Sequence, residues 1–414
     1  MKTFWQKFSF VFLCIASGVM ASASFIGIES LGSDNFTGNA ADMGRGNSGH
    51  SRTQEGISLQ NPARLAFDRK TSFMVSLDYQ GFYQSSANMG RDGTKLSSFA
   101  LGFPLGAFGA IGLGMWEVYS NDFYAQSIQD ADTFSVDYFG SLTELSPSYA
   151  LRLPGFMQPL ALGIAWRVPT GHLHRNIKRY PEKIDSEQEY WQKDLLLEDI
   201  SHATWEKSGS NPGYLAFSAQ FYQRNWSMYC GFAQGHTLNK KVYLRQAVGI
   251  IDTTAQSTNI QEFKIPRQIS AGFNYSLNSW LSLSADVQSM AWDNEKLPTL
   301  SGLGLKEYDL SADRQMIYAL GLQKEGSSKF YESFIARSSF RLGGWYKDWY
   351  LDEVHEWAGT VGMGMPLGKR GAKLDVAIAA GHRQATSFDN EWFWTLGMSF
   401  TGVAEWGQSS RRIR

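Results

Sequence analysis

The chain has 414 residues, long enough for two or three globular domains or for one large barrel, so length alone does not decide the class. Its 38 Lys and Arg against 39 Asp and Glu give a formal net charge of -1. This balance provides no basic field to attract nucleic acid, and we expect no nucleic-acid partner. Aromatic residues make up 14% of the chain and glycines number 41, a composition that favours strands, membrane interfaces and crowded barrel walls.

Residues 1–23 have the three parts of a secretory signal peptide. Lys2 and Lys7 precede an apolar run, 8–19, and Ala21-Ser22-Ala23 closes the segment with small residues. The mature chain is therefore predicted to begin near Ser24. A membrane anchor is the alternative, but the apolar run is too short to cross a bilayer as a helix.

After Ala23 no stretch approaches eighteen consecutive apolar residues, so the sequence predicts no transmembrane helix in the mature chain. Cys14 leaves with the signal peptide. Cys230 then stands alone, which excludes an intramolecular disulfide, and its alternating neighbours indicate an inert wall residue.

The segment from Ser24 to Lys70 is polar and rich in Gly, Asn and Ser. A free periplasmic tail is one interpretation. However, Leu59, Leu65 and Phe67 would then have no apolar cover. A plug folded inside a barrel lumen would cover them.

Strict alternation of apolar and polar residues begins near residue 72 and recurs to the end of the chain, as in Ile269, Ala271 and Phe273. Many runs reach the nine to eleven residues that cross a bilayer as a tilted strand. The pattern predicts an all-β fold, a 14-stranded antiparallel transmembrane β-barrel over 71–402. The long fourth strand carries Gly140 and Pro147, so a split strand and a count of fifteen or sixteen is the alternative. The predicted strands are 72–84, 96–103, 108–119, 133–153, 158–169, 213–223, 225–235, 265–277, 280–290, 315–323, 330–342, 357–367, 372–382 and 391–402.

The connections between these strands alternate in length, with long loops at 85–95, 120–132, 170–212, 236–264, 291–314, 343–356 and 383–390. Outer-membrane barrels have short turns in the periplasm and long loops outside. We therefore expect the outer membrane of a Gram-negative bacterium, with both termini periplasmic. The longest loop, 170–212, is predicted as either one short amphipathic helix over the barrel mouth or a solvated loop.

Charged residues fall on the non-lipid face of several strands, where a lipid-facing position would be costly. We expect these side chains in the lumen, where they either pair across the barrel or line a path, with pairing as the default. They are Asp78, Arg167, Asp286 and Asp375.

No motif of a phosphate loop, dinucleotide fold, nucleophile elbow or zinc protease occurs, and we expect neither an enzyme nor a cofactor. His172 and His174 could share a strand face and bind a metal weakly, but no Cys or third His lies nearby in the sequence. The sequence therefore predicts no metal site.

Several motifs carry a family resemblance. A Gly-rich exported segment with Asn61-Pro62-Ala63, followed by fourteen strands, resembles the FadL/TodX family of hydrophobic-compound transporters, and more closely its PorV-type relatives. Further similarities are Ile265-Pro266 before the Ala271-Gly272 strand, the run 374–377, and Glu391 leading into 396–400.

The resemblance implies an N-terminal hatch over 24–70, with Asn61, Pro62 and Ala63 as its motif. It implies passage of small hydrophobic compounds across the outer membrane. The alternative is a PorV-like scaffold or structural barrel that docks secreted or surface proteins without transport. Expected partners are outer-membrane lipid, the barrel-assembly machinery, and a hydrophobic small molecule or a secreted protein. Residues 403–414 form a predicted periplasmic tail that ends in Arg411-Arg412-Ile413-Arg414.

Overall fold

The computed structural model describes residues 24–26, 31–36, 38–53, 57–68, 70–86, 88–129, 132–153, 159–180, 189–199, 213–248, 251–257, 261–292, 314–329, 331–368, 371–386 and 389–404. The predicted signal peptide, 1–23, and residues 405–414 of the predicted tail lie outside these ranges.

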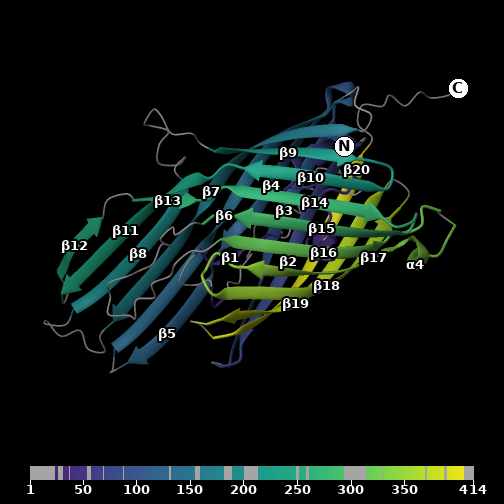
Figure 1. The fold of residues 1–414 in the computed structure, drawn as a ribbon. Coiled ribbons are helices and arrows are strands. Elements are labelled where there is room, and N and C mark those ends of the chain that lie inside the picture. Colours follow the sequence, from purple (N-terminus) through teal and green to yellow (C-terminus); the bar gives the residue numbers. More distant parts are fainter. Residues whose placement is uncertain are drawn as a thin grey trace, which may run out of the picture.

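Fourteen of the described strands close into an antiparallel barrel, as the alternating sequence predicts (Figure 1). The closure joins the first barrel strand to the last, with Thr71 opposite Ala404. The barrel strands are β2 (Thr71–Gln84), β3 (Met89–Pro104), β4 (Ala110–Ser120), β6 (Asp132–Leu153), β7 (Leu160–Tyr180), β9 (Tyr214–Tyr222), β10 (Trp226–Ala233), β14 (Gln268–Ser276), β15 (Leu281–Met290), β16 (Gln315–Lys324), β17 (Ser339–Asp348), β18 (Val354–Leu367), β19 (Ala372–Ala385) and β20 (Glu391–Ala404).

Two ends of the barrel can be distinguished by their connections. We call the end that holds Thr71 and Ala404 the short-turn end, where connections such as 223–225 and 277–280 join neighbouring strands. The opposite end, where β20 begins at Glu391, we call the long-loop end. Two loops there are shorter than predicted, 85–88 instead of 85–95 and 349–353 instead of 343–356, because the flanking strands extend further.

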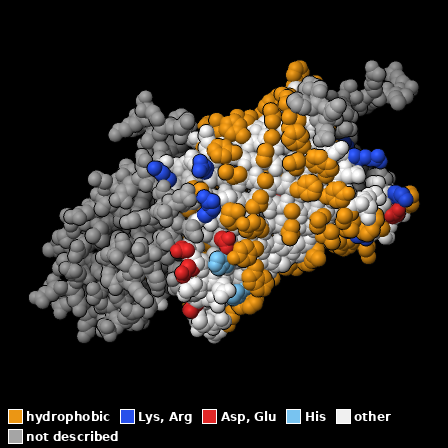
Figure 2. Space-filling view, in the orientation of Figure 1, with side chains coloured by type: hydrophobic (Ala, Val, Ile, Leu, Met, Phe, Trp, Pro, Cys, Tyr) orange, Lys and Arg blue, Asp and Glu red, His pale blue; other side chains and the backbone are white. Residues whose placement is uncertain are grey.

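Side chains alternate between the lumen and the outer face along each strand. In β16, Ile317 and Ala319 are buried, whereas Tyr318 and Leu320 are exposed on the outside. Apolar side chains cover much of the visible outer face of the barrel, and the charged groups of that view lie near its margins (Figure 2). This apolar outer face is the surface that a lipid bilayer stabilises.

The sheet of the barrel extends past it at the long-loop end as an outer sheet (Figure 1). Its strands are β5 (Phe123–Gln129), β8 (Glu189–Asp199), β11 (His236–Val248), β12 (Ile251–Ser257) and β13 (Gln261–Ile265), joined to the outer parts of β6 and β7. The prediction of a helix in 170–212 is wrong for 189–199, which form β8. Strand pairing explains the difference, because β8 hydrogen-bonds to β7 on one side and to β11 on the other.

The eleventh predicted strand, 330–342, is displaced. A short helix, α4 (Phe334–Arg337), occupies its first half, and β17 begins only at Ser339. The Ser333 side chain accepts a hydrogen bond from the Ala336 backbone and caps this helix, and the adjacent apolar pair Phe334-Ile335 breaks the alternation. None of the helices in the described ranges is long and apolar enough to span a membrane.

The N-terminal segment, residues 24–70, runs between the two barrel ends inside the ring of strands. Its elements are β1 (Ser33–Asp34), α2 (Ala40–Met43) and the 3-10 helix η1 (Pro62–Phe67). β1 pairs with β4 at the long-loop end, α2 contacts β18, β19 and β20, and η1 contacts β6, β7 and β9. The described parts of this segment thus contact strands on several sides of the barrel.

Candidate functional site

The motif Asn61-Pro62-Ala63 joins the N-terminal segment to one wall of the barrel. The side-chain amide of Asn61 is buried and donates hydrogen bonds to Gln220 Oε1 at 2.8 Å and to the His50 carbonyl at 3.0 Å. The Ala63 backbone N–H donates to Ser218 Oγ at 2.8 Å. Pro62 opens η1, where its fixed φ fits the first turn and its missing N–H costs nothing.

Helix α2 occupies the middle of the lumen. Asn39 caps it by accepting from the Asp42 N–H at 2.8 Å, and Asp42 in turn pairs with Arg45 at 2.5 Å. Arg45 is fully buried and donates from Nη1 to Gln323 Oε1 on β16 at 2.7 Å. A buried guanidinium with both an acid and an amide partner fixes α2 against the wall.

Glycines on the wall permit the close approach of this segment. A Cβ on Gly343 would overlap the backbone of Arg45 and Gly46, and a Cβ on Gly163 would overlap the backbone of Pro62 and Ala63. Gly46 itself has a φ of +67°, a conformation that favours glycine.

Of the four charges predicted from the alternation, Asp78, Arg167 and Asp375 are buried and Asp286 is half-buried, and each contacts a different set of groups. Asp375 accepts from Arg341 Nη1 at 2.6 Å, and Asp286 accepts from the Gly49 backbone N–H. Asp78 stands opposite Lys95 in the β2–β3 register, while Lys95 Nζ lies 3.1 Å from Glu117 Oε1. The structure thus brings Asp286 to the N-terminal segment and joins Asp375 on β19 to Arg341 on β17, two strands away.

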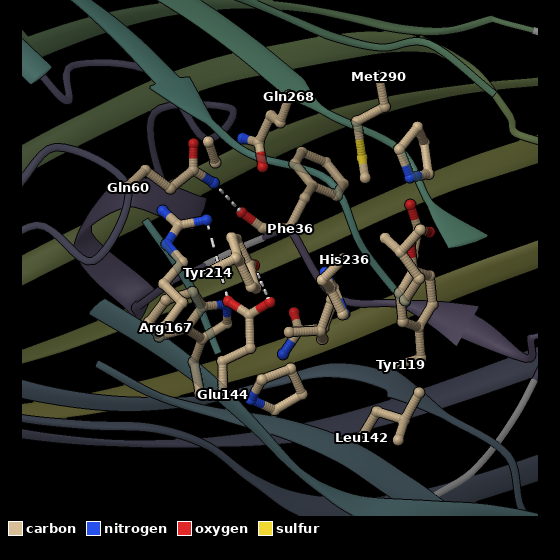
Figure 3. Close-up of a pocket in the computed structure, with 18 of the residues that line it drawn as sticks. Phe36, Gln60, Tyr119, Leu142, Glu144, Arg167, Tyr214, His236, Gln268 and Met290 are labelled. Carbon is tan, nitrogen blue, oxygen red and sulfur yellow. Dashed lines mark hydrogen bonds and ion pairs between the residues drawn. The ribbon is translucent and has the colours of Figure 1, made fainter. Parts of the chain in front are cut away.

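Arg167 belongs to a group of side chains around a small cavity below the long-loop end (Figure 3). Its Nη1 lies 3.9 Å from Glu144 Oε2, and its guanidinium stacks on the Trp116 ring at 4.9 Å. Tyr214 donates to the same Glu144, and the His236 ring stacks on Tyr214 with centroids 4.5 Å apart. Figure 3 shows Glu144, Arg167 and Tyr214 turned toward one another, with Phe36 and Gln60 of the N-terminal segment beside them.

The cavity is small. Its volume is about 70 Å³, and two other cavities between the N-terminal segment and the wall measure about 30 and 10 Å³. Ligand pockets have volumes of ~300 Å³ or more, so these spaces fit a few water molecules. A larger depression of about 340 Å³, bounded by Arg52, Arg224 and Glu325 among others, lies at the short-turn end and has a polar lining.

Apolar clusters cover the N-terminal segment at both ends of the lumen. At the long-loop end, Ile26 and Leu31 pack with Trp349, Tyr350 and other buried side chains. At the short-turn end, Ile57 and Leu65 pack with small and apolar wall residues such as Ala100 and Ala150. Buried apolar side chains of the N-terminal segment therefore pack against the wall near both ends of the barrel.

His172 and His174 flank the Phe139 ring, at centroid distances of 6.2 and 4.6 Å. Within the described ranges, no group of three or more His, Cys, Asp or Glu gathers in a way that could hold a metal ion.

The sequence did not point to several residues that organise the lumen, among them Arg45, Glu144, Arg383 and Glu391. Glu144 is a single charge inside the predicted strand 133–153, so the alternation could have identified it, whereas Arg383 falls at the first position of the predicted loop 383–390. Arg45 and Glu391 were not identifiable, because their partners Gln323 and Ser24 lie hundreds of positions away in the chain.

Comparisons with solved structures support the fold. The chain is similar to the CymD monoaromatic hydrocarbon channel, with 11% identity, a TM-score of 0.56, and coverage of 90% of this chain and 99% of that one. It is similar to a Pseudomonas aeruginosa FadL homologue, with 12% identity, a TM-score of 0.57 and coverage of 89% and 98%. The Ralstonia pickettii toluene transporter TbuX gives 14% identity, a TM-score of 0.53 and coverage of 89% and 99%. At these identities the likeness shows a FadL/TodX-type fold.

A search of curated protein sequences finds no match. A family model does match, over residues 5–411, which is nearly the whole chain, and its description is BamG. The chain belongs to the BamG family.

Proposed function

We propose that this protein is an outer-membrane barrel with a closed lumen that works with the barrel-assembly machinery as a docking subunit. The observation that carries the proposal is the packing of the N-terminal segment, whose described residues hold buried ionic and amide contacts to wall side chains. Three cavities between segment and wall measure at most about 70 Å³, and the larger depression of about 340 Å³ lies at the short-turn end and has a polar lining. Membership in the BamG family supports a link to the barrel-assembly machinery.

The sheet beyond the long-loop end supplies a surface for a partner. In the described part of the chain, β5 pairs only with β6 and β12 only with β11, so each leaves one edge of backbone groups without a strand. Such edges accept an added strand from another protein. The PorV-like resemblance points to the same docking role without transport.

In this proposal the long-loop end faces the outside of the cell and the short-turn end faces the periplasm. The sorting of loop lengths and the apolar outer face support this orientation. Ala404 then leads into a periplasmic tail. Ser24, the predicted start of the mature chain, lies at the opposite end beside Glu391, which differs from the expectation that both termini are periplasmic.

Depletion of the protein from the cells that produce it tests the docking role. We expect other outer-membrane barrels to decline in the membrane, while uptake of aromatic hydrocarbons stays unchanged. Normal levels of the other barrels together with a loss of hydrocarbon uptake would overturn the proposal.

Passage of small hydrophobic compounds is the second candidate function, and the fold likeness to hydrocarbon channels favours it. The segment 24–70 would then act as a movable hatch, with Asn61, Pro62 and Ala63 at its contact with β9. Uptake that rises when Asn61→Ala loosens this contact would favour the candidate. Equal uptake in wild type and variant would exclude this gating.

A further inference from the structure

A buried cluster of charges lies at the long-loop end, where the N-terminal segment meets β17 to β20. Arg383 donates to Glu356 Oε2 at 2.6 Å and to Glu391 Oε1 at 2.5 Å. Lys347 pairs with Asp34 of the N-terminal segment. Arg383 also interacts electrostatically with Asp34, and Lys347 with Glu356, so the two ion pairs form one cluster.

The described members of this cluster do not balance in charge. Asp34, Glu356 and Glu391 contribute three negative charges, whereas Lys347 and Arg383 contribute two positive ones. All five side chains are at least nine-tenths buried, and the cavity beside them measures only about 30 Å³. A net charge in such a site is costly unless a further cation balances it.

The first residues of the predicted mature chain bind one of the three acids, Glu391. Ser24 Oγ donates to Glu391 Oε1 at 2.9 Å, and the Phe25 backbone N–H donates to Oε2 at 2.6 Å. The Ser24 backbone nitrogen donates to Ser33 Oγ at 2.7 Å. Ser24 and Glu391 are both fully buried.

Cleavage after Ala23, which the Ala21-Ser22-Ala23 sequence predicts, would change the charge of that nitrogen. Hydrolysis adds one water across the Ala23–Ser24 peptide bond, and Ala23 leaves with a carboxylate. Ser24 keeps its nitrogen as an ammonium group with three donors in place of one N–H.

We propose that the α-ammonium group of Ser24 docks beside Glu391 after signal-peptide cleavage and completes the charge balance of this cluster. Processing thereby fastens the start of the N-terminal segment at the long-loop end. The docked terminus holds the lumen closed in the mature protein, and a chain that keeps residues 1–23 lacks the balancing charge.

Chemical labelling of the terminal amine tests the proposal. The mature protein, folded in detergent, is treated at neutral pH with an amine-acylating reagent, and the labelled fraction at Ser24 is read by mass spectrometry against the unfolded protein. We expect at least tenfold slower labelling of the Ser24 amine in the folded state. Equal rates in the two states, or a mature chain that begins at another residue, would overturn the proposal.

Two variants test whether Glu391 is the group that protects the Ser24 amine from labelling. Glu391→Gln removes the acid but keeps its size, and we expect it to restore most of the labelling rate. Glu325→Gln is the matched control, because Glu325 pairs with Arg52 at the opposite end of the lumen. Gel mobility of the folded barrel shows which variants fold. If Glu391→Gln does not fold, the wild-type comparison still decides, and protection that survives in a folded Glu391→Gln contradicts the docking site.

Discussion

The side-chain amide of Asn61 donates a hydrogen bond to Gln220 Oε1 at 2.8 Å, and this contact ties the N-terminal segment to β9. The two residues are 159 positions apart, and the same amide also binds the His50 carbonyl. One side chain therefore holds two turns of the segment and one strand of the wall together.

Asn61→Ala should weaken the docking of the N-terminal segment by about 1–3 kcal/mol, because Gln220 and the His50 carbonyl lose a buried partner. The measurement is the thermal unfolding of the purified barrel. Gln126→Ala is the control, since Gln126 Oε1 accepts a hydrogen bond from the Tyr124 hydroxyl at an exposed site. Equal shifts in the two variants would contradict the account.

Gly163→Ala tests the close approach of the N-terminal segment to the barrel wall at β7. The new methyl group would overlap the backbone of Pro62 and Ala63, and overpacking of this kind costs about 1–3 kcal/mol. Gly359→Ala on β18 is the matched control, because a Cβ there meets no atom within 4 Å. We expect faster proteolysis of the N-terminal segment in the first variant and wild-type resistance in the second, and the reverse order would refute the placement of η1.

Asp375→Asn should destabilise the barrel by about 3–5 kcal/mol, since it leaves the buried Arg341 guanidinium without its acid. The double variant Arg341→Met with Asp375→Asn should recover much of this loss. Asp348→Asn, which breaks an exposed pair with His355, should cost less than about 1 kcal/mol. Urea unfolding in lipid vesicles measures all three, and a single variant as stable as the double would contradict the pairing.

Burial lowers the pKa of His50 from 6.5 to about 4, although the nearby Asp42 acts in the opposite direction. In the unfolded chain His50 takes up its proton below pH 6.5, whereas in the folded chain it does so only near pH 4. Its contribution to stability is therefore complete above pH 6.5 and declines as the pH falls toward 4.

His50→Gln should remove this decline. The readout is the difference in unfolding free energy between wild type and variant, measured from pH 7.5 to 4.5. Burial raises the pKa of Asp68 to about 6, which has the opposite effect on stability. Because both proteins contain Asp68, its effect cancels in the difference. A difference that does not change with pH would show that His50 titrates normally in the folded protein.

The barrel could be predicted from the sequence because residues in each wall strand alternate between the outer face and the lumen. In β16, for example, Tyr318 and Leu320 lie outside and Ile317 and Ala319 inside. The outer sheet could not. β8 forms a strand because it pairs with β7 on one side and with β11 on the other. Its sequence, Lys193-Asp194-Leu195-Leu196, does not alternate between apolar and polar residues, so the period of two that identified the wall strands is missing.

Some residues of the candidate site could likewise be recognised from the sequence and others could not. Asp375 and Arg167 were recognisable, because a charge in an alternating strand has a defined face. Glu391 gave no signal beyond its place before a strand, because its partners Ser24 and Phe25 come from the other end of the chain. Contacts of this range are set by the closure of the barrel around residues 24–70.

Quantitative affinity purification from native outer membranes tests the central claim most directly. The protein is recovered after mild crosslinking, and its molar ratio to the components of the barrel-assembly machinery is measured. We expect a fixed ratio that survives repeated purification and that falls when the edge of β12 is blocked by proline substitution. Recovery of the barrel alone, together with hydrocarbon uptake by cells that depends on it, would contradict the account.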